Sequence, residues 1–263
     1  MNNKTKVFLL IAVLSAGLAG ALASGQVAGA GNDTTKAAKE ETIPLKEAKL
    51  NIEHNDEDKD TGFQGFWDSE GWSRMRVTGP DGKVLDFKAE GELGRLGLTE
   101  LFFESVEPEN ADVPISELLE TLPEGEYKFE GTAVEDGEKI GPTVGTALLT
   151  HDIPKGPELL TPEEDEEVSA DEDLPVSWEA VDETIDGSPV NIIAYQLIIE
   201  KDEESHPHMI GKLGLSMYVP ADVTEITVPS GFLEPGTDYE WEVLAIEESG
   251  NQSIKSSSFS TSD

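Results

Sequence analysis

The segment 233–245 constrains the fold more than any other part of the chain. It turns on Pro235 and Gly236 and then reads Tyr-Glu-Trp-Glu-Val-Leu-Ala from Tyr239, so large apolar residues alternate with acidic ones. Alternation with period two is typical of an antiparallel strand with one buried face. A leucine, a Pro-Gly turn and a tyrosine that opens a strand predict a tyrosine corner, in which the phenol bonds to the backbone just upstream. We therefore expect an antiparallel β-sandwich.

The first residues have the pattern of an export signal. Two lysines precede an apolar run (residues 7–23) that ends in the cleavage pattern Ala21-Leu22-Ala23. The alternative is an uncleaved membrane anchor, which needs about 20 apolar residues, and glycines dilute the end of this run. We expect a signal peptide at residues 1–23, export to the periplasm or the medium, and no membrane insertion after cleavage.

Composition excludes several classes of function. The chain has no cysteine, which excludes disulfides, cysteine nucleophiles, thiolate zinc sites and iron–sulfur clusters. It has 55 acidic and 18 basic residues, a net charge of −37. Nucleic acids and anionic membranes require a basic surface, so neither is expected as a partner. The acidity is compatible with attraction for calcium or a basic surface, and also with solubility in salty surroundings, which we favour.

The 263 residues leave room for two domains of about 100 residues each. Residues 24–44 are small and polar without apolar periodicity and are expected to form a flexible tether. Pro154 and Pro157 interrupt regular pairing and mark a short linker. We therefore expect a first domain at 45–153 and a second at 157–263.

In the first domain the periodicity predicts mostly strands. The turn Gly79-Pro80-Asp81-Gly82 predicts a hairpin, and apolar alternation predicts strands near residues 48–52, 98–105, 127–131 and 146–151. Apolar residues at i, i+3, i+4 and i+7 predict one short helix within 113–122. Residues 122–127 read Leu-Pro-Glu-Gly-Glu-Tyr, an echo of the corner at 233–239. The predicted fold class is all-β: two antiparallel β-sandwich domains in tandem, the first with one short helix.

Residues 157–260 also carry a family resemblance. Pro157-Glu158-Leu159-Leu160-Thr161-Pro162 is similar to a proline-bounded first strand, Leu174-Pro175-Val176-Ser177-Trp178 to a second strand, and the alternation of Ile193, Tyr195, Leu197 and Ile199 to a third. Together with the corner they make this region resemble a fibronectin type III domain. The first domain resembles no named family; the combination is expected in exported proteins of bacterial type.

The resemblance implies both a core and a role. The implied core residues are Trp178, Tyr195, Leu233, Tyr239 and Trp241. The implied role is a module that spaces, presents or contacts other molecules outside the cytoplasm. An Arg-Gly-Asp tripeptide is absent from the sequence, so integrin-type binding is not implied.

Three aspartates are candidate calcium ligands. Asp56, Asp58 and Asp60 have the one-three-five spacing of a calcium loop, but an EF-hand requires glycine and glutamate where Thr61 and Trp67 stand. A different calcium site and an acidic turn between strands are both compatible with this pattern. We favour the turn, so no metal is expected.

Aromatic and histidine residues supply the other candidates. Phe63, Phe66, Trp67 and Trp72 lie close together in the sequence and could form a platform for sugar rings or the core of the first domain, which we favour. The pair His206 and His208 is expected in an exposed loop, since two imidazoles without converging carboxylates do not make a metal site.

No catalytic motif occurs in the sequence. It lacks a Gly-x-Ser-x-Gly elbow, a His-Glu-x-x-His motif and a phosphate-binding glycine loop. We therefore expect an exported, non-catalytic binding or structural module without a cofactor, whose partner is a protein or a cell-surface polysaccharide. Two alternatives remain: a carbohydrate-binding module, and a metal-dependent hydrolase in the first domain.

Overall fold

The computed structural model describes residues 42–263, and the expected signal peptide and most of the expected tether lie outside this range. Within it the chain forms fifteen strands and two short helices, α1 (Gly91–Leu96) and α2 (Ile115–Thr121). The predicted all-β fold class is therefore confirmed. Within the described residues, the last part of the expected tether contains a strand, because β1 (Ile43–Pro44) pairs in parallel with β7 (Glu138–Leu149).

The long strand β3 (Asp60–Thr78) organises the first half. Its first part pairs with β2 (Glu47–Asn55) and β5 (Leu98–Glu104), and its last part pairs with β4 (Val84–Lys88) and β6 (Gly125–Glu135). One strand therefore belongs to two layers. A Cβ at Gly71, between the two parts, would lie 2.5 Å from the carbonyl oxygen of Val134, so this close approach requires glycine.

The first-half core lies between these layers. Its largest fully buried members are Trp67, Trp72, Phe129, Ile52 and Met75, each no more than 1% exposed. The partly buried leucines of α2 pack against this core, as the helical periodicity predicts. The predicted hairpin is also present, since β3 and β4 pair from Arg74 with Lys88 to Thr78 with Val84.

The second half is a sandwich of two antiparallel sheets. One sheet has the order β13-β10-β8 and the other contributes β12-β11-β14-β15. This is the strand order expected of a fibronectin type III-like domain. The strands are β8 (Leu159–Thr161), β9 (Glu166–Val168), β10 (Leu174–Trp178), β11 (Ile192–Lys201), β12 (Gly214–Pro220), β13 (Glu225–Val228), β14 (Asp238–Glu247) and β15 (Gln252–Thr261).

The residues named from the resemblance lie in the core of this sandwich. Trp178, Tyr195, Leu233, Tyr239 and Trp241 are all at most 5% exposed. The hydroxyl of Tyr239 accepts a hydrogen bond of 2.8 Å from the backbone N–H of Glu234, which is the geometry of a tyrosine corner.

The echo at residues 122–127 makes a related bond. The hydroxyl of Tyr127 donates a hydrogen bond of 3.0 Å to the backbone carbonyl of Pro123. Both tyrosines therefore tie the start of a strand to the turn before it, one as acceptor and one as donor.

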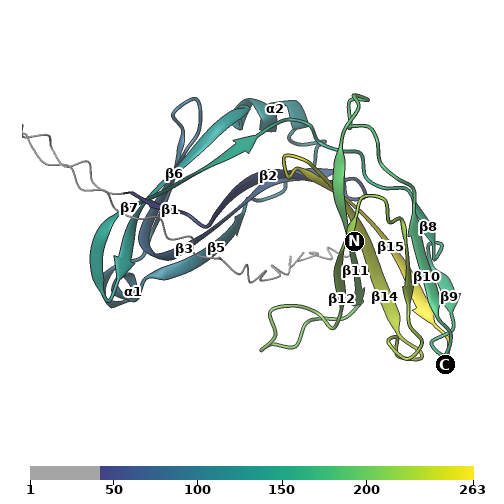
Figure 1. Ribbon diagram of the computed structural model, residues 1–263. Helices are drawn as coiled ribbons and strands as arrows, with labels where there is room; N and C mark the ends of the chain where they lie inside the picture. The colour runs from purple at the N-terminus through teal and green to yellow at the C-terminus, as the bar shows by residue number, and fades with distance from the viewer. Residues whose placement is uncertain (1–41) are drawn as a thin grey trace, which may run out of the picture.

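The two halves share one sheet. β15 pairs in parallel with β2, with Gln252 opposite Glu53 and Ile254 opposite Asn55, which joins the strands of both halves into a twelve-stranded sheet. Figure 1 shows the result as an arch, with the first half at one end and the sandwich at the other. In the same view β8 and β10 lie on the outer side of the sandwich, and β11, β12 and β14 of the shared sheet lie on the inner side.

Candidate functional site

The junction between the halves is held by a buried asparagine. Asn251, at the turn before β15, is 0% exposed. Its Oδ1 accepts a bond of 2.8 Å from the N–H of Ile52, and its Nδ2 donates one of 3.1 Å to the carbonyl of Thr150. The hydroxyl of Ser253 also donates to the carbonyl of Pro154, in the linker. Asn251 and Ser253 thus satisfy backbone groups of β2, of the segment after β7 and of the linker.

Three glutamates converge beside this junction. Carboxylate oxygens of Glu53, Glu104 and Glu107 all lie within 4.8 Å of one another. Strand pairing places Glu53 and Glu104 on one face of the sheet. Glu53 is two residues after Asn51 and so shares its face, Asn51 is opposite Gln64, and Gln64 is opposite Glu104. The opposite face carries Ile52 and Trp67 into the core, so the glutamates lie on the face turned away from the first-half core.

Two glutamines connect these carboxylates. Gln252 donates hydrogen bonds from Nε2 to Glu53 and, at 3.3 Å, to Oε1 of Gln64. Gln64 in turn donates from Nε2 to Oε1 of Glu104 at 3.2 Å. The hydrogen bonds therefore link a residue of the second half to carboxylates of the first.

Burial changes the protonation of this cluster. Loss of solvent raises the pKa of Glu53 to about 7, and the neighbouring Glu104 carboxylate adds to this effect. Burial and the nearby charges of Glu53, Glu104 and Asp60 raise the pKa of Glu107 to about 8. Carboxylates this close either share protons or hold a cation through their oxygens, as calcium sites do.

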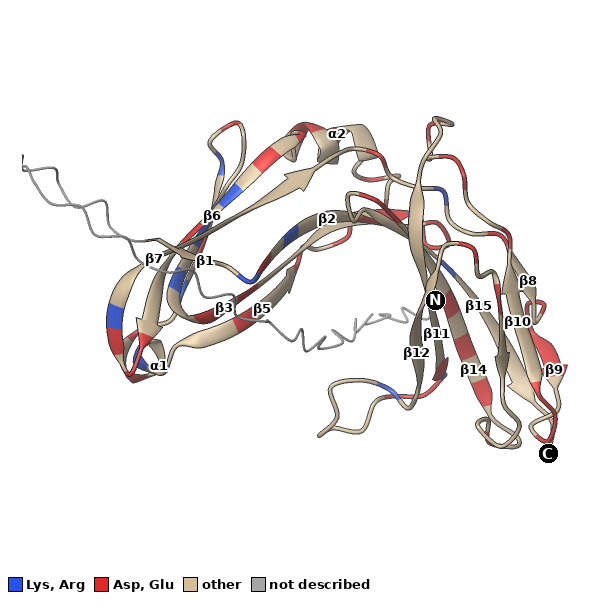
Figure 2. Ribbon diagram, in the orientation of Figure 1, with Lys and Arg blue, Asp and Glu red and all other residues tan. Residues whose placement is uncertain are grey.

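A second acidic group lies on the same face in the second half. Burial, reinforced by Glu240 and Glu200, raises the pKa of Glu242 to about 8. Glu242 is next to a small apolar cluster on this face, formed by Ile198, Leu244 and Ile254. Figure 2 shows that acidic residues occur along both halves of the arch. The face turned away from both cores therefore combines apolar side chains with carboxylates of raised pKa.

A groove of about 980 Å³ lies in the angle between the two halves. Its walls come from β2, β7, the start of β11, the end of β12 and the turn between β14 and β15. Three large apolar side chains in it are half exposed or more: Leu148 at 61%, Ile193 at 51% and Tyr218 at 52%. Gln252, which donates to Glu53, is also part of its lining.

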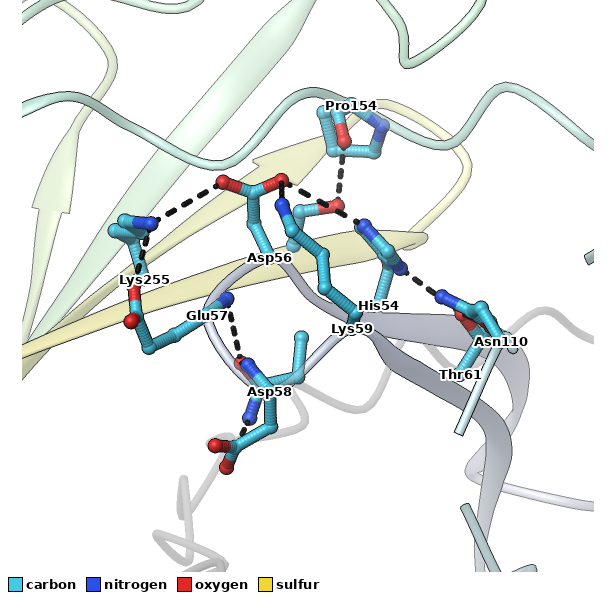
Figure 3. Close-up of polar contacts among 11 residues, drawn as sticks. His54, Asp56, Glu57, Asp58, Lys59, Thr61, Asn110, Pro154 and Lys255 are labelled. Atoms are coloured by element: carbon cyan, nitrogen blue, oxygen red, sulfur yellow. Dashed lines mark hydrogen bonds and ion pairs between the residues drawn. The ribbon is translucent and has the colours of Figure 1, made fainter. Parts of the chain in front are cut away.

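The three aspartates proposed from the sequence do not converge. Figure 3 shows Asp56 turned to Lys59 and Lys255, whose Nζ atoms lie 2.9 and 3.5 Å from its oxygens, with His54 Nε2 at 3.8 Å. Asp58 instead accepts a bond of 3.4 Å from Asn55 Nδ2. The backbone N–H groups of residues 57 and 58 both donate to Asn55 Oδ1 at 3.0 Å, which closes the turn. The segment is thus an acidic turn between β2 and β3.

Calcium should therefore have no specific effect through this turn. We expect sodium chloride and calcium chloride at equal ionic strength to raise the melting temperature about equally, because both screen the net charge of −37. The measurement is a thermal melt of residues 24–263, with the Asp58→Asn/Asp60→Asn variant as control. A saturating response to micromolar calcium that this variant loses would contradict the expectation, since specific binding stabilises by linkage.

The aromatic candidates separate into two groups. Trp67 and Trp72 are 0% and 1% exposed and pack edge to face at 5.2 Å, so neither is available to a sugar ring. Phe63 is partly buried against the same core. Phe66 lies on the opposite face, where Lys49 Nζ is 5.7 Å from its ring centre. The sugar platform suggested by their closeness in the sequence is therefore not formed by the two tryptophans.

None of the four histidines is a member of the glutamate cluster. His206 and His208 are exposed, with ring centres 5.5 Å apart in the connection between β11 and β12. His54 bonds to Thr61 through Nδ1 at 2.9 Å, and His151 bonds to the carbonyl of Leu122 through Nε2 at 2.7 Å. Among the described residues, the group that could hold a metal consists of glutamates alone. Converging acids with a histidine, the arrangement that a metal-dependent hydrolase would favour, are not found there.

Sequence reasoning did not single out the junction residues. Glu53, Glu104, Glu107, Asn251 and Gln252 come from three distant segments, and strand pairing brings them together. The one signal in the sequence was Glu53, which follows the alternating apolar residues Leu50 and Ile52. Acidic residues at alternate positions occur on any strand face that contacts solvent, so this signal does not indicate a site.

Comparisons with known proteins do not identify a family for the chain. No family model and no curated protein matches the chain. Among solved structures it is similar to a two-domain fibronectin type III segment of chicken tenascin, at 14% identity and a TM-score of 0.29 over 82% of this chain and 99% of that one. It is also similar to the FN1–FN3 domains of chicken CNTN1, at 11% identity and a TM-score of 0.32 over 84% and 68%.

A bacterial structure is similar to the same degree. The fibronectin(III)-like modules of Clostridium thermocellum CbhA match at 14% identity and a TM-score of 0.33 over 83% of this chain and 93% of that one. The fibronectin type III-like character of residues 157–263 rests on the strand order of the two sheets. Within residues 42–263, no helix is long and apolar enough to cross a membrane.

Proposed function

We propose that the chain is an exported, non-catalytic binding module that contacts a protein partner outside the cytoplasm. The observation that carries this proposal is the groove of about 980 Å³ between two halves that share one sheet. Binding sites are commonly concave, largely preformed and located at interfaces between domains. Here the shared sheet and the bonds of Asn251 hold the walls of the groove in place.

The alternatives draw less support from the same geometry. A carbohydrate-binding module would use exposed aromatic faces, whereas Trp67 and Trp72 are buried. A metal-dependent hydrolase would place a base or a histidine beside the carboxylates, and the histidines of the chain have other partners. A contact role requires neither arrangement.

The proposal is tested by retention on the cell envelope. The biotinylated mature chain, beginning at Ser24, is incubated with envelope of the producing cells before and after protease treatment of that envelope. We expect retention that protease treatment abolishes. Retention that survives protease and is competed by soluble envelope polysaccharide would favour the carbohydrate alternative, and absence of retention on both preparations would contradict the proposed function.

A further inference from the structure

The floor of the groove is a seam between two strands that do not pair. β2 and β7 lie side by side in the first half, yet within the described residues no ladder joins them. β2 pairs with β3 along its length, β7 pairs with β6, and Asn251 bridges the two strands only at the end of the seam. Residues 48–51 and 146–148 therefore line the groove without a strand between them.

Backbone direction along the seam follows from two hydrogen bonds. The N–H of Ile52 points away from β3, because it donates to Asn251, so those of Leu50 and Ala48 point the same way by alternation. The carbonyl of Val144 points away from β6, because it accepts from Leu45 N–H, so the backbone groups of residues 146 and 148 do so as well. These free backbone groups lie only in the middle of the seam, because Leu45 N–H and the Val144 carbonyl close one end and Asn251 closes the other. β2 and β7 are too close to each other for a further strand to pair between them, so the seam is the floor of the groove and an occupant must bind through side chains.

Side chains of the second half form the opposite wall. Ile193 and Tyr218 are half exposed there, and Leu148 of the seam is 61% exposed. The three apolar side chains lie in one groove together, so they can be covered by one occupant. An occupant should therefore present apolar side chains.

Charge at the groove is one-sided. Asp152 and Glu248 are exposed in its lining, and no ion pair is found for either within residues 42–263. Lys49, the lining cation, is paired with Glu47 at 3.1 Å. Gln252 connects the groove to the buried Glu53. An occupant that complements these groups carries positive charge.

We propose that this groove binds a positively charged segment of a partner protein, which contacts Leu148, Ile193 and Tyr218 through apolar side chains. The inference rests on the proposed function and specifies the charge and the apolar character of the partner segment. Lysine or arginine of the segment lies against Asp152 and Glu248, and its smaller apolar residues occupy the space between the two halves.

The test uses a fluorescein-labelled synthetic peptide, three repeats of Val-Lys-Thr, and fluorescence anisotropy with the mature chain. We expect saturable binding. The Leu148→Thr/Ile193→Thr variant should weaken it at least about tenfold, because two apolar contacts are lost while both positions keep a residue suited to strands. A peptide with glutamate in place of lysine should show no binding.

Leu160→Thr is the matched control, since Leu160 is 43% exposed on β8, outside the groove. It should bind the lysine peptide as the unaltered chain does. Circular dichroism melts of both variants establish that each is folded. Sedimentation of the unaltered chain tests the other possible occupant, a second copy.

Three results would overturn the inference. They are no binding of the lysine peptide, equal binding of the glutamate peptide, or equal weakening in the groove and control variants. A dimer that dissociates in the Leu148→Thr/Ile193→Thr variant would also overturn it, because the groove would then be an interface between copies. If the Leu148→Thr/Ile193→Thr variant is still retained on the envelope, the groove is not the binding site, but the proposed function is not contradicted.

Discussion

Glu53→Gln should stabilise the protein by about 3 kcal/mol at about pH 8 and leave its stability nearly unchanged at about pH 4. Burial raises the pKa of Glu53 from its ordinary 4.5 to about 7 in the folded chain. Below 4.5 the carboxyl is protonated in both states and costs nothing. As the pH rises through about 7 the folded chain must hold a buried charge, so that stability is lost. Glutamine keeps an oxygen that can accept the hydrogen bond from Gln252.

The measurement is urea unfolding of both forms across this pH range. Glu130→Gln, at an exposed position of β6, is the matched control because it removes the same formal charge from the surface. Burial lowers the pKa of His54 from its ordinary 6.5, so this residue lowers the stability of the folded chain as the pH falls below 6.5. The effect is the same in the unaltered chain and in both variants, so it cancels in the comparison. Equal pH profiles for the Glu53 and Glu130 variants would show that Glu53 is not buried as described.

Asn251→Ala should lower the free energy of unfolding by about 2–4 kcal/mol. The substitution removes the acceptor for the N–H of Ile52 and the side-chain donor to the carbonyl oxygen of Thr150. Ile52 and Asn251 are both fully buried, so water does not replace the lost bonds. Since this side chain bridges both halves, we also expect their unfolding to become less cooperative, with tryptophan fluorescence and circular dichroism no longer coincident.

Asn191→Ala is the control for this change. Asn191 is exposed, and its Nδ2 donates to Glu248 at 3.0 Å, so its loss should cost well under about 1 kcal/mol. Denaturation midpoints and slopes of the two variants are compared under the same conditions. Similar small effects at both positions would indicate that the junction is held by strand pairing alone.

The second half of the fold was predictable because its signals are local. Apolar alternation around Tyr195 and Trp241 determines which strand face is buried, and Pro235-Gly236 determines where the strand bearing Tyr239 begins. The first half was harder. The change of layer within β3 depends on contact between Gly71 and Val134, distant in the sequence, so no local pattern predicts it.

The candidate site was less predictable than the fold. Asp56, Asp58 and Asp60 attracted attention because they lie close together in the sequence, yet neighbouring side chains in a turn find lysine and asparagine partners locally. Glu53 and Glu104 meet only because β2 and β5 flank the same part of β3. Sites formed by sheet register cannot be read from spacing along the chain.

The shared sheet also determines how the molecule carries mechanical load. A hinge between separate domains would bend freely, whereas here the angle of the arch is set by strand twist and by three paired positions, Glu53–Asn55 with Gln252–Ile254. This short parallel ladder is the strand pairing that joins the two halves, so tension between the two ends concentrates on it. The arch is thus a stiff bracket whose weakest point adjoins the groove, and a ligand held in the groove would brace that point.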